Sequence, residues 1–229
     1  KRPSAGSSLA KFFIGIQSKQ LSGHFIAGAL VGWASPKSSM SVRDFSSRRY
    51  TARLWALLRL KRQQHMTQLK ILHHPDPRLR TKATPVQTFD ADLAVFAQDM
   101  LETMYAAPGI GLAATQVNVH KRIIVVDVSE DNDQPHTLIN PVLEPYGSKI
   151  KGEEGCLSVP EVYDSVERFE HVIVRAQDVA GNPVEFTADG MLSICIQHEC
   201  DHLEGKLFVD YLSSLKRGRI TKKLRERAR

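Results

Sequence analysis

The chain has 229 residues, of which 42% are hydrophobic, and a net charge of +6. A chain of this length buries one hydrophobic core but hardly two large ones, so a single domain with tails is expected. Three cysteines, an odd number in a chain of this size, argue against a secreted disulfide framework. No apolar run approaches the roughly 20 residues that cross a bilayer, so we expect no membrane contact.

Charge is distributed unevenly along the chain. Residues 1–65 contain 12 Lys or Arg and one acid, Asp44, and residues 216–229 contain eight Lys or Arg and one acid, Glu226. Residues 66–215 carry 23 acidic and 11 basic side chains. The pattern predicts a basic, Ser- and Arg-rich extension, then an acidic folded domain, then a basic helical tail.

The N-terminal extension has two interpretations, which the sequence leaves open. Its Ser and Arg content, its scarcity of acids and its lack of sustained periodicity are typical of an organelle transit peptide. Alternatively, it is upstream sequence outside the natural protein. The chain does not begin with Met, and Met66 stands directly before the first segment with the pattern of a folded domain.

Three helices are expected after this point. Apolar residues recur at helical spacing over 93–104, and Asp90 is placed to cap the start of that helix. A second helix is expected over 189–205, ending at a glycine. A third follows Ser213 or Ser214 and carries the basic tail.

Strand-like segments lie between the first two helices, at 122–128, 137–143, 172–177 and 183–187. Turn residues such as Pro145, Gly147, Gly181 and Asn182 separate the last three. Strands separated by turns and flanked by helices indicate an α+β fold rather than alternating βαβ units.

The strongest chemical signal is HECDH, residues 198–202, within the second expected helix. His198 and His202 share a helix face and could bind one metal ion, while Glu199, about 100° around the helix, could act on a metal-bound water. The alternative is two unrelated surface histidines. This alternative is less favoured, because the helix face that carries the histidines is otherwise apolar, with Met191, Ile194 and Cys195 on it.

A catalytic site of this kind needs a third protein ligand. Phe208 occupies the position where a metzincin would have its third histidine. Glu204, Asp210 and Glu226 are unconvincing as the downstream carboxylate of a thermolysin-like site. The ligand is therefore expected upstream, where Cys156 of EGCLS offers a thiolate in a turn between strands. A lone cysteine is ordinarily a small buried hydrophobe, but the missing ligand favours coordination. Cys195 is expected to pack beneath the site and Cys200 to point elsewhere.

The third motif is GIGLAATQ, residues 109–116. Its glycines resemble a dinucleotide fingerprint, but that motif follows a strand and opens a helix, whereas this one follows a helix. We interpret it as a backbone loop that an extended peptide approaches at Ile110 and Gly111, with Gln116 offering an amide donor. A simple turn is an equally good interpretation of the glycines alone.

In this order and spacing, GIGLAATQ, EGCLS and HECDH resemble the three signature motifs of the peptide deformylases. The resemblance covers 66–215, and EGCLSVPEVYDSVER is similar to the bacterial, iron-preferring type. It implies a small α+β domain with the HECDH helix packed among antiparallel sheets. It also implies metal-dependent hydrolysis of the formyl group of N-formylmethionyl nascent peptides, which releases formate. Ferrous iron is the implied metal, with zinc or nickel able to replace it.

Motif positions carry the family's roles to individual residues. By resemblance, Cys156, His198 and His202 bind the metal, and Glu199 moves the proton of the attacking water to the leaving amine. The amide of Gln116 and the backbone N–H of Leu157 would stabilise the oxyanion. The pocket for the substrate's methionine is expected to be apolar, from Ile110, Met191, Ile194 and Cys195, all of which could equally be ordinary core. Asp201 is expected either near the ligands or paired with Arg168.

Two rival functions fit these residues less well. A metallopeptidase would use a carboxylate or histidine where Cys156 stands, and a non-catalytic descendant would not need Glu199, Gln116 and Cys156 together. We expect a monomer in the bacterial cytoplasm, or in an organelle if residues 1–65 are a transit peptide. The basic tail is either a solvated helix or, as in related bacterial enzymes, a ribosome-docking helix.

Overall fold

The structure, a computed structural model, describes residues 68–227. The extension over 1–65 therefore lies outside the described residues. No helix within the described range is both long and apolar enough to cross a membrane.

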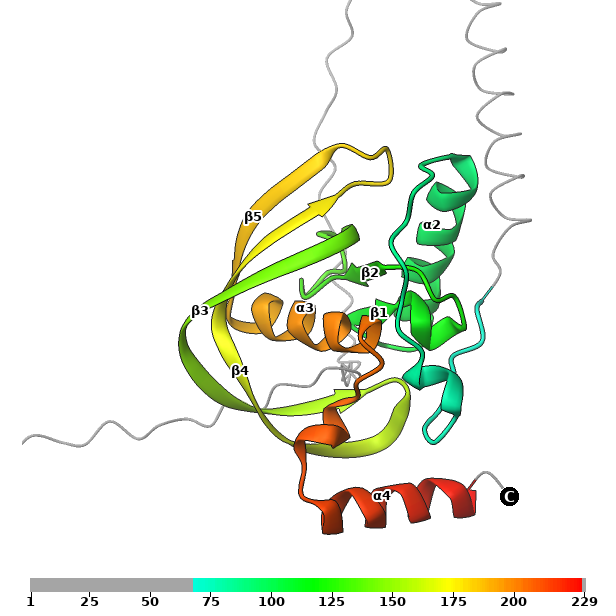
Figure 1. Ribbon diagram of the computed structural model, residues 1–229, viewed down its shortest axis with the longest axis vertical. Helices are drawn as coiled ribbons and strands as arrows, with labels where there is room; N and C mark the ends of the chain where they lie inside the picture. The colour runs from blue at the N-terminus through cyan, green and yellow to red at the C-terminus, as the bar shows by residue number, and fades with distance from the viewer. Residues whose placement is uncertain (1–67, 228–229) are drawn as a thin grey trace, which may run out of the picture. The chain divides into compact units, whose positions relative to one another are not determined.

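A single antiparallel sheet of five strands organises this part of the chain (Figure 1). Neighbouring strands in the sheet are also neighbours in the sequence, so each connection is a simple reversal of direction. The strands are β1 Gly111–Ala113, β2 Ile123–Val126, β3 His136–Cys156, β4 Val159–Gln177 and β5 Pro183–Asp189.

The three expected helices are confirmed. Helix α2, Ala91–Ala106, begins where the Asp90 carboxylate accepts a hydrogen bond from the Leu93 N–H at 2.9 Å. Helix α3, Gly190–Leu203, follows β5 directly and carries HECDH. Helix α4, Ser214–Arg227, carries most of the basic tail.

Strand β2 explains how the layers stack. All four of its residues are apolar and buried, because α3 covers one face of the sheet and α2 the other. Ile124 and Val126 pack in the cluster with α3, and Ile123 and Val125 pack in the cluster with α2. The period-two alternation of a strand thus divides one apolar run between two cores. The expected α+β fold is confirmed, with α3 central.

Two sequence interpretations need correction. The segments 137–143 and 172–177 are only parts of β3 and β4, which continue as a long hairpin up to the turn after Cys156. Pro145 and Gly147 lie inside β3 near a register shift rather than ending it, because pairing with β4 continues on both sides of the irregularity.

The motif GIGLAATQ is likewise not a plain loop. Gly111–Ala113 pair with β2 as strand β1, and Ala114–Val117 form a 3-10 turn. Strand β1 lies at the end of the strand order, so among the strands of residues 68–227 it pairs with β2 alone.

A third apolar cluster joins the C-terminal region to the end of the long hairpin. It contains Cys156 and Val159 from the hairpin, Phe208 from the segment after α3, and Leu224 from α4. Helix α4 is therefore packed through one apolar side while most of its surface is exposed.

Candidate metal centre

Three side chains that could bind a metal ion converge at the centre of the domain. The donor atoms of Cys156, His198 and His202 all lie within 4.8 Å of one another, and all three side chains are buried. The sulfur of Cys156 is 3.3 Å from Nε2 of His202. Helical spacing places both imidazoles on one face of α3, and the tight turn between β3 and β4 brings Cys156 to that face.

A buried carboxylate orients one of the two imidazoles. Nδ1 of His198 lies 2.8 Å from Oε2 of Glu154, and because an ionised carboxylate only accepts, Nδ1 is the donor. Nε2 of His198 is therefore left with a lone pair for a metal ion, the arrangement that fixes the tautomer of a ligating histidine. The sequence reasoning did not identify Glu154, although it is the first residue of the EGCLS motif.

Arg168 on β4 holds that carboxylate in place. It donates from Nε to Oε1 of Glu154 at 2.7 Å and from Nη2 to Oε2 at 3.1 Å. Burial favours the neutral acid, but hydrogen bonds from His198 and Arg168 outweigh it and lower the pKa of Glu154 to about 2. Arg168 also donates to Asp201 at 2.5 Å, so Asp201 pairs with Arg168, one of the two alternatives expected.

The second glutamate near the centre has the opposite environment. Glu199 is 1% exposed, and its Oε2 has no hydrogen-bond partner among the described residues. Burial raises the pKa of Glu199 to about 7. A buried, unpartnered carboxylate oxygen beside three convergent donors fits a site built to hold a metal ion and a water or substrate.

The position of Gly111 has no room for a side chain, because Glu199 and Cys195 of α3 lie against it. A Cβ at Gly111 would lie 2.7 Å from Sγ of Cys195 and 2.9 Å from Cδ of Glu199, closer than real Cβ contacts. The absence of a side chain thus lets strand β1 approach α3 beside the carboxylate.

Gln116 and Leu157 also lie at this centre. The Gln116 amide donates to Oγ of Ser158 at 3.1 Å and lies 3.7 Å from Sγ of Cys156, while its oxygen accepts from the Ala113 N–H at 2.7 Å. The amide is therefore held from both ends with its nitrogen beside the metal donors. Leu157 follows Cys156 in the turn, and its side chain lies against Gly109.

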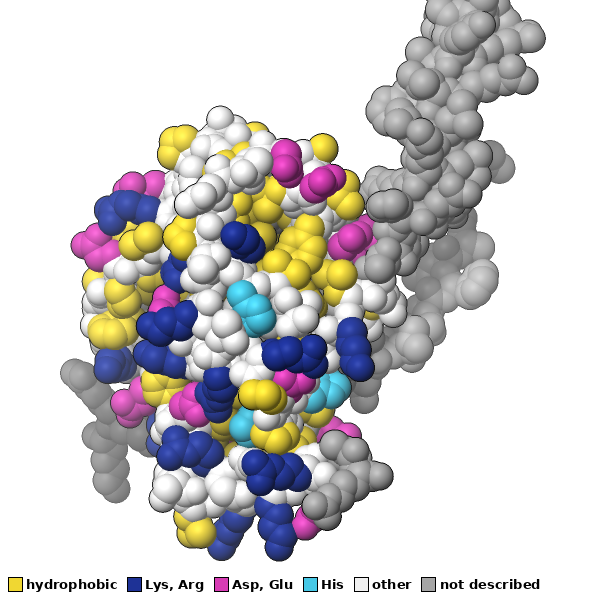
Figure 2. Space-filling view, turned by 45° about the vertical axis from the view of Figure 1, so that its right-hand side comes forward, with side chains coloured by type: hydrophobic (Ala, Val, Ile, Leu, Met, Phe, Trp, Pro, Cys, Tyr) yellow, Lys and Arg dark blue, Asp and Glu magenta, His cyan; other side chains and the backbone are white. Residues whose placement is uncertain are grey.

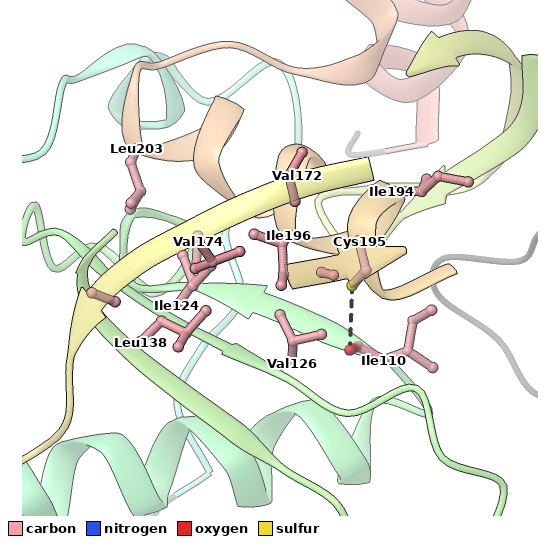
Figure 3. Close-up of a cluster of buried hydrophobic side chains, with 13 residues drawn as sticks. Ile110, Ile124, Val126, Leu138, Val172, Val174, Ile194, Cys195, Ile196 and Leu203 are labelled. Atoms are coloured by element: carbon pink, nitrogen blue, oxygen red, sulfur yellow. Dashed lines mark hydrogen bonds between the residues drawn. The ribbon is translucent and has the colours of Figure 1, made fainter. Parts of the chain in front are cut away.

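The apolar substrate candidates lie in the core between the sheet and α3. Ile110, Ile194 and Cys195 belong to this cluster, and Met191 packs against it (Figure 3). A pocket of about 240 Å³ is lined by Cys156 together with other residues that include Leu157, Val159 and Tyr163. None of the four candidates lines that pocket. Cys200, partly buried, lines a different pocket together with Arg168 and Asp201.

A helix that presents HExxH beside a third donor from a neighbouring strand defines a metal-dependent hydrolase. Comparison with known proteins gives the family. The polypeptide deformylase family model matches residues 68–218. The chain is 61% identical over 160 residues to a peptide deformylase of Hahella chejuensis, covering 69% of this chain and 95% of the relative. It is 58% identical over 165 residues to one of Pseudomonas aeruginosa, covering 72% and 98%.

Solved structures agree with the sequence comparison. A crystal structure of a peptide deformylase from Legionella pneumophila superimposes with a TM-score of 0.67 at 47% identity, covering 71% of this chain and 99% of that one. The chain belongs to the polypeptide deformylase family. It is a metal-dependent hydrolase that removes the N-terminal formyl group of nascent peptides and releases formate.

Proposed function

We propose that Cys156, His198 and His202 hold a ferrous ion and that Glu199 moves protons between water, substrate and leaving amine. The observation that carries the proposal is the convergence of the three donors with the unpartnered oxygen of Glu199. A divalent metal in such a site polarises the formyl carbonyl and lowers the pKa of a bound water.

Glu199 is placed for general base and then general acid catalysis. Its pKa of about 7 lies near physiological pH, where a carboxylate can both accept a proton and return it. It would take the proton of the attacking water and deliver it to the amine that leaves. Formate and a free α-amino group are the products.

Gln116 and Leu157 are the proposed oxyanion donors. The Gln116 amide nitrogen lies beside Cys156, and the backbone N–H of Leu157 belongs to the residue that follows it. Donors held at fixed positions stabilise charge that develops only in the transition state. The three hydrogen-bonding contacts of the Gln116 side chain support this fixed position.

The free edge of β1 is the proposed binding surface for the formylated peptide. The Ile110 carbonyl accepts from the Asp127 N–H at 2.9 Å, so the peptide groups of Ile110 point towards β2. Because these groups alternate along a strand, those of Gly111 point to the opposite edge, where an extended peptide could pair. We propose that Ile110, Met191, Ile194 and Cys195 form the apolar surface for its methionine.

Iron is proposed because of the thiolate. A cysteine sulfur donates more charge to a metal than a third imidazole and suits a redox-active ion. Metal analysis after anaerobic purification, coupled to a formate-release assay on a short formylmethionyl peptide, tests this assignment. We expect about one iron per chain and an activity that is lost in air but kept by zinc- or nickel-loaded protein. Anaerobic protein that holds zinc alone would contradict iron, and activity without metal would contradict the whole site.

A ribosome-docking role is proposed for α4. Its basic residues are largely exposed and gather at the lower end of the molecule (Figure 2), whereas the acidic body would bind RNA poorly without them. They are Lys216, Arg217, Arg219, Lys222, Lys223, Arg225 and Arg227. Contacts to phosphates release counterions, so affinity should fall steeply with salt.

The test compares the intact chain with one that ends at Leu215, at low and physiological salt. We expect the truncation to weaken binding to purified ribosomes while hydrolysis of a short formylated peptide continues. Equal ribosome binding by both proteins would rule out docking through α4. We also propose that the protein is a monomer, that it is located in the bacterial cytoplasm and that its catalytic domain spans 66–215.

A further inference from the structure

Cys195 is a buried thiol that the proposed chemistry leaves without a role beyond the apolar pocket. It lies on α3 one turn before His198, is 0% exposed, and is not one of the three clustered metal donors. Its Sγ donates a hydrogen bond to the Ile110 carbonyl at 3.4 Å, a contact that joins the metal-binding helix to strand β1 (Figure 3). Burial raises the pKa of this thiol well above its usual value, so it keeps the proton it donates.

The Ile110 carbonyl is thus held from two directions. The Asp127 N–H donates to it at 2.9 Å from the end of β2, and the Cys195 thiol donates from α3. Asp127 is itself anchored, because its carboxylate accepts from the Tyr105 hydroxyl at 2.7 Å and from the Ser129 N–H at 2.9 Å. A carbonyl fixed in this way determines where the next peptide group, that of Gly111, lies.

The Cys195 thiol also lies close to Gly111 and to the Glu199 carboxylate. A Cβ at Gly111 would come within 2.7 Å of Cys195 Sγ and 2.9 Å of Glu199 Cδ, so these side chains sit close together under β1. The sulfur therefore lies next to the Glu199 carboxylate, and both groups lie against the backbone of Gly111.

We infer that Cys195 is a positioning residue that sets, through the Ile110 carbonyl, the distance between the peptide-binding edge at Gly111 and the Glu199 carboxylate. The inference rests on the proposed roles of β1 and Glu199. Its consequence is a fixed approach of the scissile formyl group to the base, a geometry in which displacements of about 1 Å cost around 100-fold in rate.

The test uses a pair of variants that differ by one hydroxyl group, Cys195→Ala and Cys195→Ser, in the metal-loaded enzyme. Both remove the sulfur, but serine keeps a donor that can reach the carbonyl after a shift of tenths of an ångström. We expect Cys195→Ala to lower kcat by about tenfold, with metal content unchanged, because the reacting groups are misplaced by a fraction of an ångström. Cys195→Ser should recover most of that loss.

Ile196→Val is the matched control for packing. It removes one methylene from the same helix and the same apolar cluster, and its side chain has no hydrogen-bond donor for the Ile110 carbonyl. The kcat should therefore stay unchanged while the melting temperature falls. Thermal unfolding and metal content are measured for all three variants.

Equal losses of kcat in Cys195→Ala and Cys195→Ser, or a similar loss in Ile196→Val, would assign Cys195 to packing alone and overturn the inference. If the Cys195→Ala protein does not fold, the Cys195→Ser protein decides the question. A kcat of Cys195→Ser near that of the unsubstituted protein supports the donor role, and a tenfold lower kcat refutes it. Failure of the proposed function is detected separately, as full activity in Glu199→Gln.

Discussion

Helices α3 and α4 have the same length of 14 residues and opposite character. Helix α3 buries nine side chains, among them His198, Glu199 and His202 of its motif. The other two positions of the motif, Cys200 and Asp201, are partly exposed. Helix α4 buries only Leu224 among its described residues, and its charged side chains are exposed to solvent. The proposed chemistry of α3 therefore depends on a few buried groups, whereas the proposed ribosome binding of α4 depends on many exposed charges.

The ion pairs of the two regions differ in the same way. Arg168 and Glu154 are paired at 2.7 Å with side chains 6% and 1% exposed, whereas Lys216 of α4 pairs with Asp164 while 56% exposed. Removing one partner of a buried pair costs about 3–5 kcal/mol, but an exposed pair contributes only about 0–1 kcal/mol. Single substitutions should therefore have large effects around α3 and small ones on α4.

The largest effect is expected for Cys156→Ala. The variant loses the single sulfur donor of the cluster, so metal affinity and formate release should both collapse, with activity lower by at least about a thousandfold. Metal content after dialysis, measured beside a formate assay, tests this expectation. Stoichiometric metal in the variant would mean that the third ligand lies elsewhere.

Arg168→Met should have the next largest effect. It leaves Glu154 buried with a single strong partner, His198, so unfolding free energy should fall by about 3–5 kcal/mol. Metal affinity should fall roughly 10–100-fold, because the carboxylate that orients a ligand loses its anchor.

Arg175→Met is the matched control on the same strand. Arg175 pairs with Glu144 and Glu185 on the surface and is 48% exposed, so its loss should change stability by less than about 1 kcal/mol. The measurements are denaturant unfolding and metal titration of both variants. If Arg175→Met lowered the free energy of unfolding and the metal affinity as much as Arg168→Met, buried and exposed ion pairs would not differ as proposed.

The smallest effect is expected from removal of the N-terminal extension. Both helices, the sheet and the proposed donors lie after Met66, so a protein beginning there should unfold at the same temperature and release formate at the same rate. The measurements are thermal unfolding and steady-state kinetics of both proteins side by side. Aggregation or loss of activity of the shorter protein, under conditions where the longer one is stable, would contradict a catalytic domain that starts at Met66.

Local patterns predicted the helices and the donors they carry. The four-residue spacing of His198 and His202 requires only a helix, and Asp90 caps α2 by a contact within three residues. The orientation of His198 could not be found this way, because Glu154 is 44 positions away in sequence and reaches the ring only through the fold.

Strand lengths were underestimated for a similar reason. The outer part of the β3–β4 hairpin contains Pro145, Gly147 and exposed polar residues rather than a clean alternation, and pairing between the two strands makes it extended. Gly111 illustrates the same limit. The sequence indicated a position free of bulk, but the carboxylate and thiol that require the glycine come from α3, far along the chain.

The most direct test of the account is Glu199→Gln, analysed for metal content and formate release in the same preparation. The substitution keeps the size of the side chain and touches none of the three donors, so metal content should stay at that of the unsubstituted protein. Loss of the proton carrier should lower kcat by roughly 100- to 10,000-fold. A variant with full metal and undiminished kcat would contradict the role of Glu199, and with it the central claim that the buried, unpartnered carboxylate beside the three donors performs the proton transfer.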